Sequence, residues 1–373
     1  MDKFRILFFI SICGIYTISF SQSKIPNENQ FDFYNSLPDD TAKAEKLYSI
    51  GFSLRVEDPM LSFAYAKELY KCAINIESKK YEAKAYSLTG ILNYRGSQFN
   101  RALEYHFKAI EIRENLKDQS ELGKSYTNVG NVYSDLGNFE LSEKFHLKAL
   151  NIFTLKKDEK QILNCLCNLG VLKHAQKEDS AAIKNLEKAL MLAEQLNDYE
   201  SRAMCCNNLG LIYEERKNWE MALNYYFENV RLNEQMDTKK NLASGYFNLG
   251  SVYTAMKNKE KATEWLEKSL KIATNNEYDD VKGMTLEKMA EISALNGNYK
   301  FAYEQICEQK KLAENSYLSR DEISAPFILP EAKSKEKSLY ENILSGWYLF
   351  AIGLTLGVIP FIFLRPKKKK SYE

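Results

Sequence analysis

The sequence predicts an all-α solenoid of helix–turn–helix hairpins, and two regularities in the spacing of small residues support this fold class. Small residues recur at a constant step of about 40 positions, which marks a repeat protein, at Gly90, Gly130, Gly170, Gly210, Gly250 and Ala290. Twelve positions after each of these comes a second small residue: Ala102, Ser142, Ala182, Ala222, Ala262 or Ala302. Small residues at fixed offsets on two apolar segments let paired helices approach closely. Each repeat should therefore be a helical hairpin that stacks on the next.

The repeats also share a tripeptide that ends at the glycine, and the whole pattern resembles the tetratricopeptide repeat. The tripeptide reads Asn168-Leu169-Gly170, Asn208-Leu209-Gly210 and Asn248-Leu249-Gly250. Three positions after the glycine the family has a tyrosine, which is present here as Tyr133, Tyr213 and Tyr253 but replaced by Asn93, Lys173 and Ser293 in other repeats. The resemblance covers residues 41–316 and implies a right-handed superhelical solenoid of seven repeats.

The chain before the repeats, residues 22–40 with two prolines, is expected to be an extended lead-in. The first hairpin, 41–76, is atypical because its Gly51 is out of step, as expected for a capping repeat. Regular repeats follow near 80–118, 119–158, 159–198, 199–238 and 239–278, and a seventh near 279–316 lacks the glycine. Between the two helices of a repeat, Gly137 and Gly297 predict left-handed helix caps.

The N-terminus has the pattern of a secretory signal peptide, which we place at residues 1–21. Lys3 and Arg5 precede an apolar run from Ile6 to Phe20, and Ser19 and Ser21 supply the small residues of a cleavage site. Cleavage after Ser21 would leave Gln22 first.

The C-terminus predicts a membrane anchor. A linker and juxtamembrane segment, 317–342, leads into residues 343–364, which carry no charge and are long enough to span a bilayer as a helix. The basic tail 365–373 follows and is expected to be cytoplasmic. The repeats should then be extracytoplasmic. Since no Asn lies in an Asn-x-Ser/Thr frame, we expect a single-pass protein of a bacterial inner membrane with a periplasmic repeat domain.

The candidate site is a ladder of asparagines two residues before the glycines: Asn128, Asn168, Asn208 and Asn248. The resemblance implies that these lie on the first helix of each repeat, which lines a concave groove where such asparagines contact the main chain of a bound peptide. A carboxamide offers both a donor and an acceptor, which matches the peptide C=O and N–H. The alternative is that the asparagines pair with neighbouring helices within the scaffold.

Other positions of the same groove should set its specificity. Lys84 and Lys124 lie six residues before successive glycines, and Tyr94 and Glu214 lie four residues after theirs. The two lysines could clamp a ligand carboxylate, and the alternative is that they are solvated surface residues.

The sequence contains no motif for catalysis, for a cofactor or for a metal. His106 and His146 occupy the same aromatic position one repeat apart, so we expect them to fill the core. The cysteines other than Cys13 are expected to be buried thiols, although a contact between Cys167 and Cys206 is conceivable. The net charge of +1 indicates no nucleic-acid partner.

We therefore expect a membrane-anchored, non-enzymatic receptor or adaptor that binds a peptide or an extended protein segment. The layout resembles the sensor half of bacterial receptors that continue into a kinase or a DNA-binding domain, but only nine residues follow Leu364, so we expect no output domain here. The alternatives are a structural scaffold for an envelope complex and a truncated sensor. The Gly353-x-x-x-Gly357 spacing permits the span to pair with a membrane partner or in a homodimer.

Overall fold

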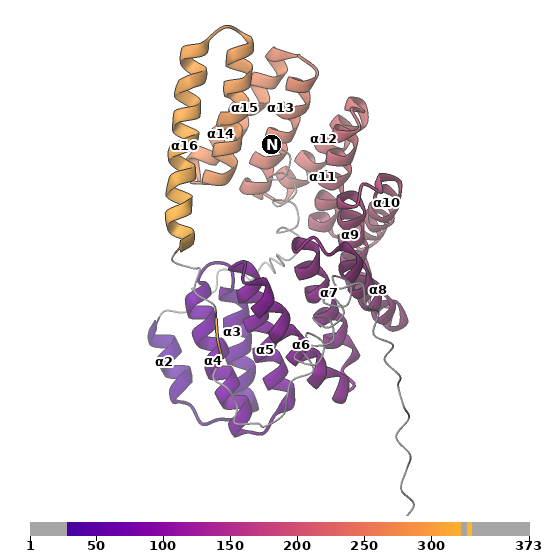
Figure 1. The fold of residues 1–373 in the computed structure, drawn as a ribbon, viewed down its shortest axis with the longest axis vertical. Coiled ribbons are helices and arrows are strands. Elements are labelled where there is room, and N and C mark those ends of the chain that lie inside the picture. The colour runs from indigo at the N-terminus through magenta and orange to yellow at the C-terminus, as the bar shows by residue number, and fades with distance from the viewer. Residues whose placement is uncertain (1–27, 322–326, 330–373) are drawn as a thin grey trace, which may run out of the picture.

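The computed structural model describes residues 28–321 and 327–329, and in this part of the chain the regular structure is entirely helical (Figure 1). A short helix, α2 (Glu28–Ser36), comes first. The other helices pair as α3 (Thr41–Leu54) with α4 (Pro59–Asn75), α5 (Lys79–Arg95) with α6 (Phe99–Asn115), α7 (Gln119–Asp135) with α8 (Phe139–Lys156), α9 (Glu159–Ala175) with α10 (Asp179–Gln195), α11 (Tyr199–Glu215) with α12 (Trp219–Gln235), α13 (Lys239–Ala255) with α14 (Lys259–Asn275), and α15 (Asp279–Leu295) with α16 (Tyr299–Asp321). The predicted all-α solenoid of hairpins is confirmed.

Two stretches near the ends of the array differ from what we expected. The segment 22–40, expected to be extended, contains α2, because Phe31 and Tyr34 pack one helical turn apart against the core of the first hairpin. The ring of Phe31 meets the ring of Tyr65 edge-on at 5.0 Å. At the other end, α16 continues to Asp321, past the start of the expected linker.

The predicted signal peptide 1–21, the span 343–364 and the basic tail 365–373 lie outside the described residues. Among the helices that are described, none combines the length and apolar character needed to cross a membrane.

One turn geometry repeats along the array and sets its period. Between α4 and α16, consecutive helices are joined through one residue with positive φ, and these residues fall at every twentieth position from Glu77 to Gly297. In the turn before α8, the N–H of Gly137 donates to the C=O of Ser134 at 3.0 Å, and the side chain of Asn138 then caps the N–H of Leu141 at 3.1 Å. This left-handed ending satisfies carbonyls at the helix terminus. Because each helix and its turn take 20 positions, each hairpin takes 40.

The two helices of a hairpin pack closely at the repeated glycine. A Cβ added at Gly210 would lie 2.5 Å from Cε1 of Tyr226, the ring that α12 packs against α11. The same contact is made by Leu186 at Gly170 and by His106 at Gly90. The small residues thus do what their spacing predicts: they leave room for one large side chain of the partner helix.

The cysteines of the described chain are free thiols. Cys167 and Cys205, on α9 and α11, are fully buried, and their Sγ atoms are 3.4 Å apart. The contact that was conceivable for Cys206 is thus made by Cys205, and Cys206 is near Glu228 of α12.

Substitution of Gly210 by Ala should show whether close packing or helix propensity decides the stability at this position. Gly210→Ala is expected to lower the free energy of unfolding by about 1–3 kcal/mol, because the added methyl group overpacks the Tyr226 ring. Gly283→Ala in α15 is the matched control, since its Cβ would come no closer than 3.9 Å to Gln309. That change should raise the stability by up to about 1 kcal/mol, as Ala favours a helix interior. Thermal unfolding followed by circular dichroism distinguishes them, and equal melting temperatures would contradict the packing.

The two buried histidines should make the fold sensitive to acid. Burial lowers the pKa of His106 to about 3 and that of His146 to about 4, since it penalises the charged imidazolium. Histidines of the unfolded chain titrate near pH 6.5. A folded-state pKa below that value means that stability is complete above about pH 6.5 and is lost as the pH falls toward the folded-state pKa.

At pH 5 the expected loss is about 2 kcal/mol of unfolding free energy for each histidine. The double substitution His106→Leu and His146→Leu should remove it, because Leu186 and Leu266 fill the same position in other repeats. The measurement is the melting temperature of both proteins at pH 7 and pH 5. If the wild-type protein and the double variant lose stability equally, these imidazoles are not the cause.

Candidate peptide-binding groove

The candidate groove lies along the first helices of the hairpins. Each first helix packs against its own second helix and also contacts the first helix of a neighbouring hairpin, as α13 does with α15 and α3 with α5. In Figure 1, α7 and α9 face the inside of the curved array, and α8 and α10 lie outside them. A surface formed by first helices is therefore continuous from one repeat to the next.

The four predicted asparagines are not equivalent. Asn128 and Asn248 are half-buried, and Asn168 and Asn208 are 8% and 7% exposed. In the described part of the chain, Nδ2 of Asn248 donates to Oδ1 of Asn207 at 2.8 Å, whereas no side-chain hydrogen bond is formed by Asn128, Asn168 or Asn208. Asn248 thus joins α13 to α11, as the scaffold alternative expects, whereas the other three carboxamides lack such a partner among the described residues and two of them, on Asn168 and Asn208, are almost covered.

The two predicted lysines do not form a clamp of free cations. Nζ of Lys84 lies 2.8 Å from a carboxylate oxygen of Glu45 on α3, and it also lies 4.4 Å from the centre of the Tyr48 ring. Lys124 pairs at 2.7 Å with Glu121 on its own helix. Each ammonium group already has an anionic partner, so a ligand carboxylate would have to compete with it.

Tyr94 and Glu214 are also held by neighbours. Tyr94 packs against Phe99 with ring centres 6.1 Å apart, and its hydrogen bond to Asp135 opposes the increase in the pKa of that carboxyl that burial causes. Glu214 accepts hydrogen bonds from Tyr226 at 2.9 Å and from Ser251 at 3.0 Å. The Glu214 carboxylate is therefore fixed in position by both its own hairpin and the next.

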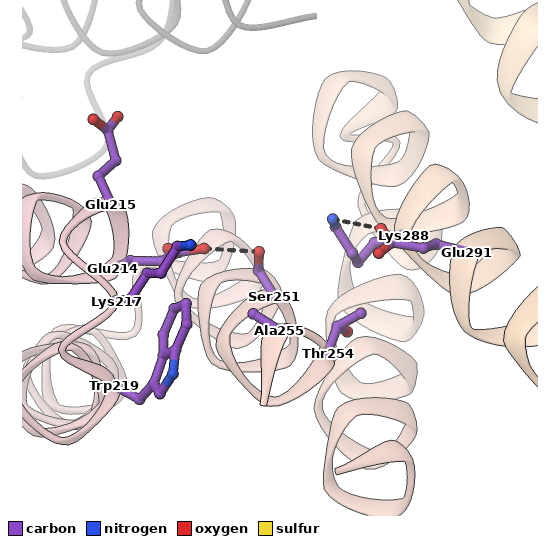
Figure 2. Close-up of a pocket in the computed structure, with 9 residues that line it drawn as sticks. All are labelled: Glu214, Glu215, Lys217, Trp219, Ser251, Thr254, Ala255, Lys288 and Glu291. Atoms are coloured by element: carbon purple, nitrogen blue, oxygen red, sulfur yellow. Dashed lines mark hydrogen bonds and ion pairs between the residues drawn. The ribbon is translucent and has the colours of Figure 1, made fainter. Parts of the chain in front are cut away.

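A cleft of about 210 Å³ opens beside Glu214 (Figure 2). Its walls come from the C-terminal ends of α11 and α13, from the turn before α12 and from α15. The residues that line it are Glu214, Glu215, Lys217, Trp219, Ser251, Thr254, Ala255, Lys288 and Glu291. On the α15 wall, Lys288 and Glu291 form an ion pair at 2.7 Å. The cleft therefore presents both signs of charge and one indole, a surface suited to a polar main chain with a charged or aromatic side chain.

Three of the residues that line the cleft hold sequence positions that the repeat pattern singled out. Lys288 occupies the place of the ladder asparagine in the last hairpin, two residues before Ala290. Glu214 and Thr254 lie four residues after their glycines. At this end of the array, one ladder position and two specificity positions therefore meet in one cleft.

Sequence reasoning missed several residues of this surface. Ser251 and Glu291 follow the small residue directly, an offset at which the sequence pattern carries no signal. Asn207, the partner of Asn248, precedes a ladder asparagine and could have been found only by testing contacts across 41 residues. Within the described residues, no group of three or more His, Cys, Asp or Glu side chains is placed to hold a metal ion.

Two family models match the chain. Residues 121–195 and 199–275 match the model of the tetratricopeptide repeat. Residues 245–319 match the model of the suppressor of spindle checkpoint defect 1 C-terminal domain. No curated protein matches the sequence significantly.

Several solved structures share the fold at low sequence identity. The apo form of RapI is 15% identical with a TM-score of 0.59, and the match covers 74% of this chain and 99% of RapI. A Rap protein complexed with competence and sporulation factor is 17% identical with a TM-score of 0.54, and the match covers 87% of this chain and 91% of that one. A signal transduction ATPase with a tetratricopeptide repeat sensor from Pyrococcus horikoshii is 17% identical with a TM-score of 0.57, over 89% of this chain and 55% of the ATPase.

The Asn248–Asn207 hydrogen bond should be measurable as a coupling between repeats. Asn248→Ala and Asn207→Ala are each expected to lower the free energy of unfolding by about 0.5–1.5 kcal/mol. The double variant should be no less stable than the worse single variant, because both changes remove one interaction. Asn128→Ala serves as the control and should change stability by less than about 0.5 kcal/mol. Urea unfolding of the wild-type protein, the two single variants and the double variant measures this coupling as a double-mutant cycle. Strictly additive losses of stability would show that the contact contributes nothing.

Proposed function

Because this chain is a tetratricopeptide-repeat protein, we propose that it binds an extended segment of a partner protein along the first helices of its hairpins. Two observations support the proposal: Asn128, Asn168 and Asn208 hold equivalent positions on successive first helices, and a cleft opens beside Glu214 at the C-terminal end of α11. Main-chain recognition by carboxamides is compatible with many side chains. Specificity then comes from the cleft, where charges of both signs and Trp219 meet the ligand.

In this proposal the asparagine ladder fixes the register of the bound segment, and the cleft selects among the side chains that the segment carries. A ligand that lies along α7, α9 and α11 can use one asparagine per repeat and then enter the cleft between α11 and α15. Glu214 is held by Tyr226 and Ser251, so its carboxylate need not be ordered when the ligand binds. Such preorganisation reduces the entropy cost of binding.

The proposal also includes the location of the domain. Residues 1–21 are proposed to direct secretion, and residues 343–364 to anchor the repeats on the periplasmic side of a bacterial inner membrane. The supporting observations are the charge-free stretch and the basic residues that follow it. In that position the protein acts as a receptor or adaptor for a partner protein.

A structural scaffold is a second candidate, and one observation favours it. The last helix of the described residues, α16, carries Tyr299, Tyr303 and Ile306 at helical spacing, with exposed fractions of 72%, 71% and 41%. Exposed aromatic side chains on a helix at the end of the described array are suited to protein contacts. In the scaffold role this end of the array, and not the groove, would hold the partner.

The deciding experiment is a quantitative pull-down of full-length protein from solubilised membranes. The variant replaces Asn128, Asn168 and Asn208 with Ala and leaves Asn248 intact, because Asn248 joins two helices. At least about tenfold less partner should be recovered, since each lost hydrogen bond to a ligand is worth about 1 kcal/mol.

The matched control replaces three exposed asparagines on second helices, Asn115, Asn151 and Asn224, with Ala. It should recover the partner like the wild-type protein. If the ladder variant also keeps its partner while Tyr299→Ser with Tyr303→Ser loses it, the scaffold function is correct and the groove proposal is wrong. A full-length chain that leaves the membrane fraction in a high-pH wash would contradict the anchor.

A further inference from the structure

Two of the three residues that the structure describes after α16 are buried against the first hairpins of the array. Phe327 and Leu329 are 4% and 3% exposed, whereas Ile328 between them is 48% exposed. This alternation of buried, exposed and buried side chains is that of an extended segment. In Figure 1 the segment appears as a short yellow trace beside α3 and α4, far along the chain from the indigo helices that it contacts.

The main chain of this segment is bound by side chains of α5 and α6. Nδ2 of Asn93 donates to the C=O of Phe327 at 2.8 Å, and the N–H of Phe327 donates to Oδ1 of Asn93 at 3.1 Å. One carboxamide thus satisfies both polar groups of one residue. The N–H of Leu329 then donates to the hydroxyl of Tyr105 at 2.8 Å.

The side chains enter two apolar sites of the first hairpins. Phe327 packs against Ala66, Leu88 and Leu92, and its ring centre lies 4.9 Å from that of Phe63. Leu329 belongs to the core cluster of the first hairpin. Ile328 is half-covered and belongs to neither apolar cluster, so the two side chains that enter the site are Phe327 and Leu329, two positions apart.

The residue that makes this site unusual is Asn93. It occupies the position that Tyr133, Tyr213 and Tyr253 hold in other repeats, and it is fully buried. A tyrosine side chain cannot offer a paired donor and acceptor to one residue of a strand. Only the hairpin of α5 and α6 therefore has this carboxamide at this position among the described repeats.

We propose that α4, α5 and α6 form a binding site for an extended Phe-x-Leu segment, and that residues 327–329 of the same chain are its resident ligand. Five residues, 322–326, separate this segment from α16, and a linker of that length reaches at most about 20 Å. The end of α16 is thereby tied to the first hairpins. The contact closes the curved array as a strap, at a site separate from the cleft between α11 and α15.

The occupancy of the site can be measured on the native protein. In the full-length chain, the amides of Phe327 and Leu329 should exchange with deuterium at least about tenfold more slowly than unprotected amides. Asn93→Ala should speed the exchange of the Phe327 amide, because it loses its acceptor. Unprotected amides in the wild-type protein would overturn the proposal.

Recognition is tested with a fluorescent peptide of residues 321–332. The full-length variant Phe327→Ala with Leu329→Ala has an empty site and should bind the peptide, whereas the wild-type protein should bind it at least about tenfold more weakly, because its tethered segment competes at high effective concentration. Two further peptides carry Phe327→Ala or Ile328→Ala, so that recognition is tested without any further change to the protein. The first should bind at least about tenfold more weakly and the second like the parent peptide.

Equal binding by the wild-type and empty proteins, or no binding by the empty protein when it retains its helical circular dichroism, would overturn the proposal. Sedimentation distinguishes the source of the bound segment. A dimer that dissociates when Phe327 and Leu329 are replaced would mean that the segment comes from a second copy, and the strap within one chain would be wrong.

Discussion

The close contact between each repeated glycine and one large side chain of the partner helix is the constraint on which the array depends. It fixes how the two helices of a hairpin meet, as at Gly210 and Tyr226. The identity of the large side chain is free: His106, Leu186 and Tyr226 all serve. With the helix spacing fixed at each hairpin and an identical turn at every twentieth residue, the hairpins stack in one register and their first helices form a continuous face.

Much of the fold could be predicted because its causes are local and repeated. The glycine step and the second small residue define hairpins without any knowledge of tertiary contacts. The turns could not be predicted so well, since Lys177, Asn197 and Asp237 adopt the left-handed conformation that favours glycine. Such residues incur about 1–2 kcal/mol of strain, which the packing of both flanking helices must offset. The helix α2 was missed because its stability comes from packing on Tyr65 and not from its own sequence.

The candidate site was predictable in its positions but not in its pairings. The offset of the ladder from the glycine places Asn128, Asn168 and Asn208 on one face. That Asn248 binds Asn207, and Lys84 binds Glu45, depends on residues a whole repeat away. In a repeat array, residues at equivalent positions lie on the same face of their helices, but the side chains beside them differ from one repeat to the next. A residue's availability for a ligand therefore has to be read from contacts between repeats.

Departures from the repeat mark the places where the array does something besides stacking. Asn93 replaces the usual tyrosine, and it is the residue that holds Phe327. In an open solenoid, each hairpin contacts only its neighbours, so a distortion at one end decays along the array. A strap from α16 to α5 removes that independence, because opening the curve anywhere strains one contact between the ends. A ligand that changes the curvature at the cleft would then alter the strap, and through it the chain that follows Leu329.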